Sequence, residues 1–202
     1  ENGIVTLDRT GFHQGEKGKV SARLHYDTHS DVLRGTMDVE NFDVGALLAL
    51  GNQKEDRVGG AMTSHIWVGG TRDNPSLGVT GEIAAGTVAG YPVTDASLDV
   101  SLSNHVLTID RLTGKQGDGS FSATGTVDFN GMMDVDVTAN DISLGLYTGL
   151  AGIDEPVSGT ASVTAHVGGT AHNPVADVSL SAKNGGVRGG TFDALAGEIQ
   201  VR

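Results

Sequence analysis

Two copies of a glycine-rich octapeptide are the first residues of this sequence that could do chemistry. VGGTRDNP occupies positions 68–75 and VGGTAHNP positions 167–174, so six of eight residues are identical at a spacing of 99. Glycine-rich loops can hold a phosphate when a helix or a Lys-Ser/Thr pair follows, and neither follows here. Paired glycines and Asn-Pro instead favour a chain reversal at a strand boundary. The octapeptides are therefore interpreted as turns.

Acidic and histidine residues offer two further candidate sites, and both are interpreted as structural. QGDGS at 116–120 is similar to calcium-binding Gly/Asp repeats, but such repeats need tandem copies and this motif occurs once. Asp134 and Asp136 lie on the same face of one strand, and the sequence shows no base paired with them. They are interpreted as part of a solvent-exposed polar face. The seven histidines show no HExxH spacing and no clustered metal spacing.

A nucleophilic site is not indicated either. The sequence contains no GxSxG nucleophile elbow, and it contains no cysteine. We therefore expect no enzyme activity, no catalytic residues, no cofactor and no metal.

The elements that must position these residues are strands with period-two alternation. Apolar residues alternate with Ser, Thr and Asp along most of the chain, as expected of antiparallel strands with one buried and one wet face. We expect an all-β, elongated, curled sheet with a U-shaped cross-section and an apolar inner face. The predicted inward positions are Val20, Ala22, Leu24, Met37, Val39, Leu98, Val100, Leu102, Phe121, Ala123, Val127, Phe129, Met133, Val135, Val137, Val163, Ala165, Val178 and Leu180.

Only two segments favour helix, at 43–52 and 141–152. Each starts with an Asp that could cap a first turn and contains a glycine that could end the helix. Both are too short to be stable without packing, and no helix is expected to cover the apolar side of the sheet.

The chain also repeats internally. A shift of 99 aligns the octapeptides, and a shift of 102 aligns VTLDRTGFHQG at 5–15 with LTIDRLTGKQG at 107–117. We predict one continuous β domain over 1–202, built from two units at about 1–100 and 101–202.

Charge and composition exclude several classes of partner. Thirteen Lys and Arg against 25 Asp and Glu give a net charge of −12, which disfavours nucleic acid and anionic membrane surfaces. No stretch approaches 18 consecutive apolar residues, and no signal peptide pattern is present. The sequence starts and ends on strand-like runs, which favours a segment of a longer protein.

The apolar sides of the strands carry the functional prediction. Either they meet as a dry sandwich or they line a trough. Dry cores recruit large aromatics, whereas only 4% of this chain is aromatic and many inward positions are Ala, Val or Gly. This composition favours a trough.

The order of these motifs resembles a known family. The pattern V-x-G, then VGGT-x-x-NP, then G-x-V-x-G runs from Val58 to Gly90 and again from Val157 to Gly189. VLTIDRLTGKQGDGSFSATGTVDFNG and MDVDVTANDISLGL add to it. Together they resemble the TamB-like proteins of the AsmA-like family across essentially the whole chain, through motifs of low specificity.

That resemblance implies a fold, a location and a role. It implies an internal piece of a β-taco rod in the periplasm of a diderm bacterium, tethered to the inner membrane by an anchor outside this segment. It implies a hydrophobic groove for phospholipid or another acyl lipid, in support of lipid transport to the outer membrane and its assembly. A TamA-like outer-membrane barrel would be contacted through regions outside this segment.

Two alternatives remain open from the sequence. One is a structural or adhesive surface β-solenoid with a dry core, functioning through its outer face. The other, a secreted carbohydrate-active β protein, lacks the paired carboxylates and exposed aromatic platforms of that class. Lipid that co-purifies with the protein would distinguish a lipid-binding groove from the first alternative, the dry-core solenoid.

Overall fold

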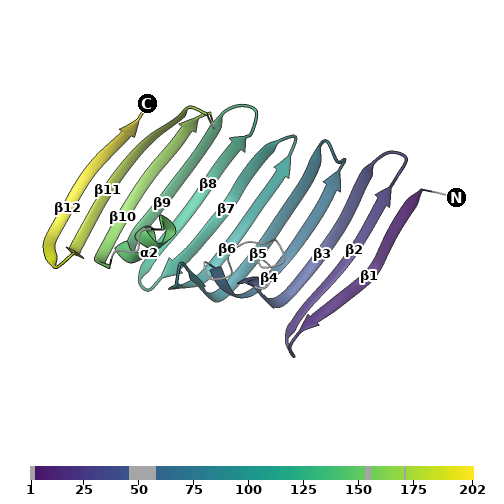
Figure 1. Cartoon of the computed structure of the whole chain (residues 1–202), viewed down its shortest axis with the longest axis horizontal. Helices are drawn as coiled ribbons and strands as arrows, with labels where there is room; N and C mark the ends of the chain where they lie inside the picture. Colours follow the sequence, from purple (N-terminus) through teal and green to yellow (C-terminus); the bar gives the residue numbers. More distant parts are fainter. Residues whose placement is uncertain (1–2, 46–57, 153–155, 171) are drawn as a thin grey trace.

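The computed structural model describes residues 3–45, 58–152, 156–170 and 172–202, and these residues form a single open antiparallel sheet (Figure 1). Twelve strands lie in the order of the sequence, each paired with its neighbours along the chain. The bounds are β1 Ile4–Gln14, β2 Gly18–Asp27, β3 Val32–Asp43, β4 Val58–Gly70, β5 Pro75–Val88, β6 Tyr91–Ser103, β7 Val106–Gln116, β8 Gly119–Asp128, β9 Met133–Ser143, β10 Val157–Gly169, β11 Pro174–Val187 and β12 Gly190–Val201, with α2 at Leu144–Leu150.

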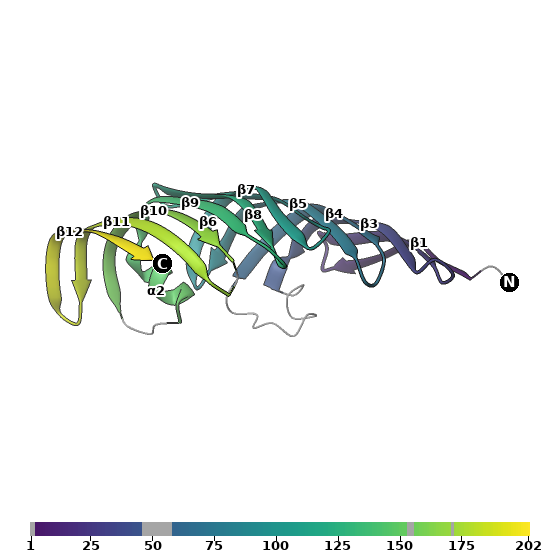
Figure 2. The same ribbon diagram turned by 90° about the horizontal axis from the view of Figure 1, so that it is seen from above.

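The sheet is curled, and α2 lies on its inner side (Figure 2). It does not close into a barrel, because β1 and β12 stand at opposite ends of the strand order. The predicted fold class, an all-β curled sheet with an apolar inner face, is confirmed.

The two octapeptides form the same turn at the same place in the sheet. Each connects a strand ending in a positive-φ glycine to a strand beginning with proline: Gly70 has φ 85° and Gly169 has φ 79°. In the first turn Thr71 N–H donates to the Asn74 carbonyl, and in the second Thr170 N–H donates to the Asn173 carbonyl, both at 3.1 Å. The interpretation of these motifs as turns is confirmed.

The turn at QGDGS is shorter than the octapeptide turns. β7 ends at Gln116 and β8 begins at Gly119, so only Gly117 and Asp118 connect them. Gly117 has φ 58°, a conformation that glycine adopts without steric cost.

A row of β-bulges was not predicted from the sequence. Asn41, Asp95, Asp141 and Asn184 all have φ of 49–50° and break the alternation of β3, β6, β9 and β11. Each bulge returns the following apolar residue to the inner side, so that Val39 and Phe42 both face inward. Asn and Asp are the side-chain-bearing residues that tolerate this backbone conformation best.

Helix α2 corrects two expectations. Asp141 does not cap it, because Asp141 lies in the bulge of β9 and Ser143 is the N-cap residue without a side-chain cap. The helix also covers part of the apolar side, since Leu146 packs with Ala139 and Ile142. Its apolar residues follow β9 directly, so the chain folds back onto its own strand. The other predicted helix, 43–52, lies mostly outside the described residues.

Candidate functional site: an apolar face on an open sheet

Strand register places the predicted inward residues on one side of the sheet, which we call the apolar face. One row of register partners runs Val20, Val39, Ser64, Gly81, Leu98, and on through Leu112, Ala123, Val137, Ala165 and Val178. Parallel rows hold the other predicted residues within strands, namely Ala22, Leu24, Met37, Val100, Leu102, Phe121, Val127, Met133, Val135, Val163 and Leu180.

Phe129 departs from this set. It lies in the turn after β8, outside the strand, and 54% of it is exposed. Its N–H donates to the His105 carbonyl at 3.0 Å in the neighbouring turn. The polar–apolar alternation of TVDF continues beyond the last residue of β8 that pairs with a neighbouring strand. The sequence pattern therefore predicted a longer strand than the structure has.

The apolar face is buried near the bulges and open elsewhere. Val20, Val39, Ile142 and Ala161 are at most 1% exposed. At the other end of the strands and toward both sheet ends the face is open: Leu24, Leu77, Leu112, Leu195, Ile199 and Val5 are 36–59% exposed. Within the part of the chain that the structure describes, the short helix α2 lies over only a portion of this face.

Aromatic rings fill space left by glycines on this face. The Phe121 ring of β8 lies over Gly114 of β7, and the Phe192 ring of β12 lies over Gly185 of β11. A Cβ at either glycine would collide with the ring. These two glycines therefore make room for the rings on the neighbouring strands.

The buried half contains two clusters. Val20, Val39 and Phe42 form one, and the Phe42 ring meets the Phe12 ring edge-on at a centroid distance of 6.1 Å. The second joins Ala139, Ile142 and Leu146, with Tyr91 and Phe121 packed against it. Because Tyr91 starts β6 and Leu146 lies in α2, the second cluster ties the two halves of the chain together.

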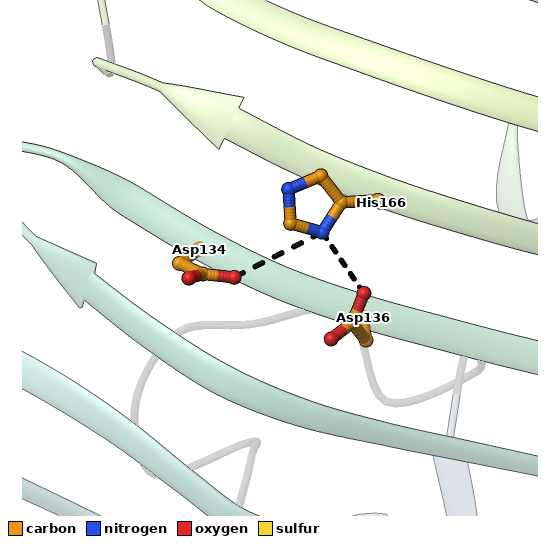
Figure 3. Close-up of side chains that lie close together, drawn as sticks. All are labelled: Asp134, Asp136 and His166. Carbon is orange, nitrogen blue, oxygen red and sulfur yellow. Dashed lines mark hydrogen bonds and ion pairs between the residues drawn. The ribbon is translucent and has the colours of Figure 1, made fainter.

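The opposite side of the sheet, which we call the polar face, carries an Asp–His cluster that the sequence did not predict (Figure 3). His166 Nδ1 lies 2.9 Å from Asp136 Oδ1 and 3.9 Å from Asp134 Oδ1. The hydrogen bond to Asp136, followed by the charges of Asp136, Asp134 and Asp177, raises the pKa of His166. Pairing of β9 with β10 creates the cluster, so only the strand register could have revealed it.

The geometry of this cluster is that of a cross-strand ion pair. Its three possible ligand atoms lie within 4.8 Å of one another, and all three residues are exposed. A second pair of the same kind, His65 Nδ1 with Asp38 Oδ1 at 2.6 Å, joins β3 and β4. Recurring His–Asp pairs on the polar face need no ion to explain them, and the prediction that no metal is bound stays a prediction.

Comparisons with known proteins give no functional information for this chain. No protein-family model, no curated protein and no solved structure matches this chain. Among the described residues, no helix has the length and apolar character needed to span a membrane.

Proposed function

We propose that the apolar face holds the acyl chains of a phospholipid or other acyl lipid. The observation that carries this proposal is a row-by-row apolar surface that crosses all twelve strands and is open along much of its length. Exposed apolar patches of this extent mark interaction sites in soluble proteins.

The chemistry of the face suits an acyl chain. Its open rows contain Leu, Val, Ile and Ala side chains, such as Leu77, Val100 and Ile109, and the register partners of these three residues on β5, β6 and β7 are apolar. Burial of apolar area contributes about 25 cal/mol per Å², whatever the position along the row. An acyl chain would therefore be held without site-specific hydrogen bonds and would meet similar contacts at neighbouring strands.

The charge of the polar face is complementary to this role. The chain has a net charge of −12, and Asp134, Asp136 and Asp177 project from the polar face. These charges disfavour docking of that face on an anionic bilayer. A lipid would be taken up on the apolar face, with its head group at the open, wet margin.

The resemblance to TamB-like proteins supports a specific setting for this activity. In that setting the chain is a segment of a periplasmic bridge that shields acyl chains between the inner and outer membranes of a diderm bacterium. The anchor and the contact with a TamA-like barrel would lie outside this segment. No catalytic step and no cofactor belong to the proposal.

A dry-core structural or adhesive solenoid is the second candidate. Its core requires the apolar faces to be sealed, as they are at Val20 and Ile142. Leu24 and Leu77, at 36% and 37% exposure, lie on the same face and are not sealed by the described residues. This difference favours lipid binding.

Site-specific crosslinking tests the proposal. A photoreactive residue at Val137, on the apolar face, should crosslink to phospholipid in a bacterial envelope, whereas the same residue at Asp136, on the polar face of the same strand, should not. Equal crosslinking from both positions, or none from position 137, would argue against the lipid-binding face.

A further inference from the structure

Helix α2 is seated on the apolar face of the sheet. It lies on the inner side, against β9 and β10 (Figure 2). Leu146 is 6% exposed and packs with Ala139 and Ile142. The Tyr147 hydroxyl donates to the Ala161 carbonyl at 3.5 Å. An apolar segment of the chain therefore covers a part of the face that we propose to hold acyl chains.

The surface beneath α2 continues into open surface. One row of register partners runs from Ile142 of β9 through Ala161 and Ala182 to Leu195 of β12. Ile142 and Ala161 are 1% exposed, whereas Leu195 is 53% exposed. The row therefore passes from the part under the helix to a part that solvent reaches. With α2 displaced, its apolar residues would form one uninterrupted strip.

α2 has little stability of its own. It contains 7 residues, and helices of this length are marginal in water without packing. Ser143 makes no side-chain cap, the first turn has no acid and the last turn has no base. Gly145 and Gly149 also have low helix propensity. The helix is therefore held by its contacts with the sheet, and segments of this kind open locally without unfolding of the whole protein.

The two glycines of α2 pack closely against the start of β6. A Cβ at Gly145 would collide with the Tyr91 hydroxyl. A Cβ at Gly149 would lie 3.1 Å from the Ala89 Cβ. Tyr91 is the first residue of β6, and Ala89 lies in the turn before it. Docking of α2 therefore depends on the lack of a side chain at position 145, and a single methyl group there would push the helix away.

α2 also carries no charge. Its sequence LGLYTGL has no acidic or basic residue, and Leu150 is 53% exposed. A helix on the surface of a soluble protein normally presents charged or polar residues to water. Displacement of α2 beside a bound lipid would bring no charged side chain into contact with acyl chains, so it carries no penalty for charge burial.

We propose that α2 is a displaceable lid and that the row beneath it is a further binding site for an acyl chain. Docked α2 and a bound acyl chain exclude each other at this row, because both would cover Ile142 and Ala161. The apparent affinity of the row is reduced according to the fraction of molecules in which α2 is docked. This inference rests on the proposed lipid binding and adds a second site with its own control.

A disulfide that ties α2 to the β5–β6 turn tests the lid. Disulfides join Cβ atoms about 3.5–4.5 Å apart, and the 3.1 Å between the Ala89 Cβ and a Cβ at position 149 needs only a small shift. The chain has no cysteine, so Ala89→Cys/Gly149→Cys introduces the only thiols. By native mass spectrometry, the oxidised protein should bind fewer palmitate molecules than the same protein after reduction. Ser101→Cys/Thr108→Cys, a register pair on the polar face, is the matched control and should bind equally in both states.

A second variant releases the helix without a disulfide. Gly145→Ala places a methyl group against the Tyr91 hydroxyl and leaves every residue of the sheet unchanged. Hydrogen exchange of the α2 amides should become severalfold faster while the β9 amides stay protected, and palmitate binding should increase. Thr148→Ala, which removes a hydroxyl that donates to the Gly145 carbonyl within the helix at 3.1 Å, should leave palmitate binding unchanged.

The outcomes separate the lid from the proposed function. Equal palmitate binding by the oxidised and reduced forms of the Ala89→Cys/Gly149→Cys chain, or no gain with Gly145→Ala, would overturn the lid alone. Absence of palmitate binding by the unsubstituted chain and by all variants would refute the lipid-binding face, and the lid with it.

Discussion

Gln116 is one of two glutamines that make equivalent hydrogen bonds in the two halves of the chain. Its Oε1 accepts a hydrogen bond from Ser143 N–H at 2.7 Å, directly before α2, and only 8% of the residue is exposed. In the first half Gln14 accepts from Asp43 N–H at 2.8 Å. Each amide connects the end of one strand to the end of another two strands away.

Gln116→Leu should therefore destabilise the protein. The substitution leaves the part-buried Ser143 N–H without this acceptor, and a donor left unsatisfied away from water costs up to about 1–3 kcal/mol. Gln14→Leu should cost less, because Gln14 is only half-buried. Urea unfolding would measure both, and equal stability of Gln116→Leu and the unsubstituted chain would contradict the role of this hydrogen bond.

His166 should titrate above its ordinary pKa of 6.5, because the hydrogen bond to Asp136 favours the protonated ring. A raised folded-state pKa means that the pair stabilises the fold below the unfolded pKa, and that this contribution is lost as pH rises through the folded pKa. By NMR titration Asp136→Asn should lower the His166 pKa more than Asp134→Asn, since Asp134 lies 3.9 Å away against 2.9 Å for Asp136. Equal effects of the two substitutions would contradict this assignment.

At the scale of the elements, the bulges in β3, β6, β9 and β11 keep the apolar residues on both sides of each bulge on the same face of the sheet. Asp141 has φ 49° between Ala139 and Ile142, both buried on the same face. A strictly alternating strand would send one of these two residues to the polar face. The bulge thus keeps both residues on the apolar face.

Asp141→Val should destabilise the protein by about 1–2 kcal/mol, because a β-branched residue is strained in the left-handed region. Asp141→Gly should be close to neutral, since glycine adopts this conformation freely. Thr138→Val, in β9 but at extended backbone, serves as the control. Thermal unfolding would separate the three, and equal effects of Val at 141 and 138 would argue against backbone strain.

The sequence predicted strands better than it predicted their irregularities. Alternation placed residues such as Val137 and Ala165 on one face because period two follows from strand geometry alone. It could not place Phe129, since a turn ends pairing without ending alternation. It missed the His166–Asp136 pair and the Gln116–Ser143 bond because both depend on register between strands that are separate in sequence.

At the scale of the molecule, the sheet is a linear array. Each strand pairs with its sequence neighbours, so pairing passes from β1 to β12 without long-range crossover. Arrays of this kind gain stability from neighbouring units and can be extended at their ends. The apolar face inherits this continuity: its rows cross from the first half of the chain into the second at the β6–β7 junction.

The lipid content of the purified protein tests the central claim most directly. Native mass spectrometry of the chain isolated from a bacterial envelope should show bound acyl lipid. Ala165→Asp, on the apolar face, should remove most of it while thermal unfolding shows a folded protein, because the carboxylate reaches water in an open face. Thr164→Asp, its exposed neighbour on the polar face, should retain the lipid. A lipid-free native chain, together with unfolding of Ala165→Asp, would contradict the account and favour a sealed core.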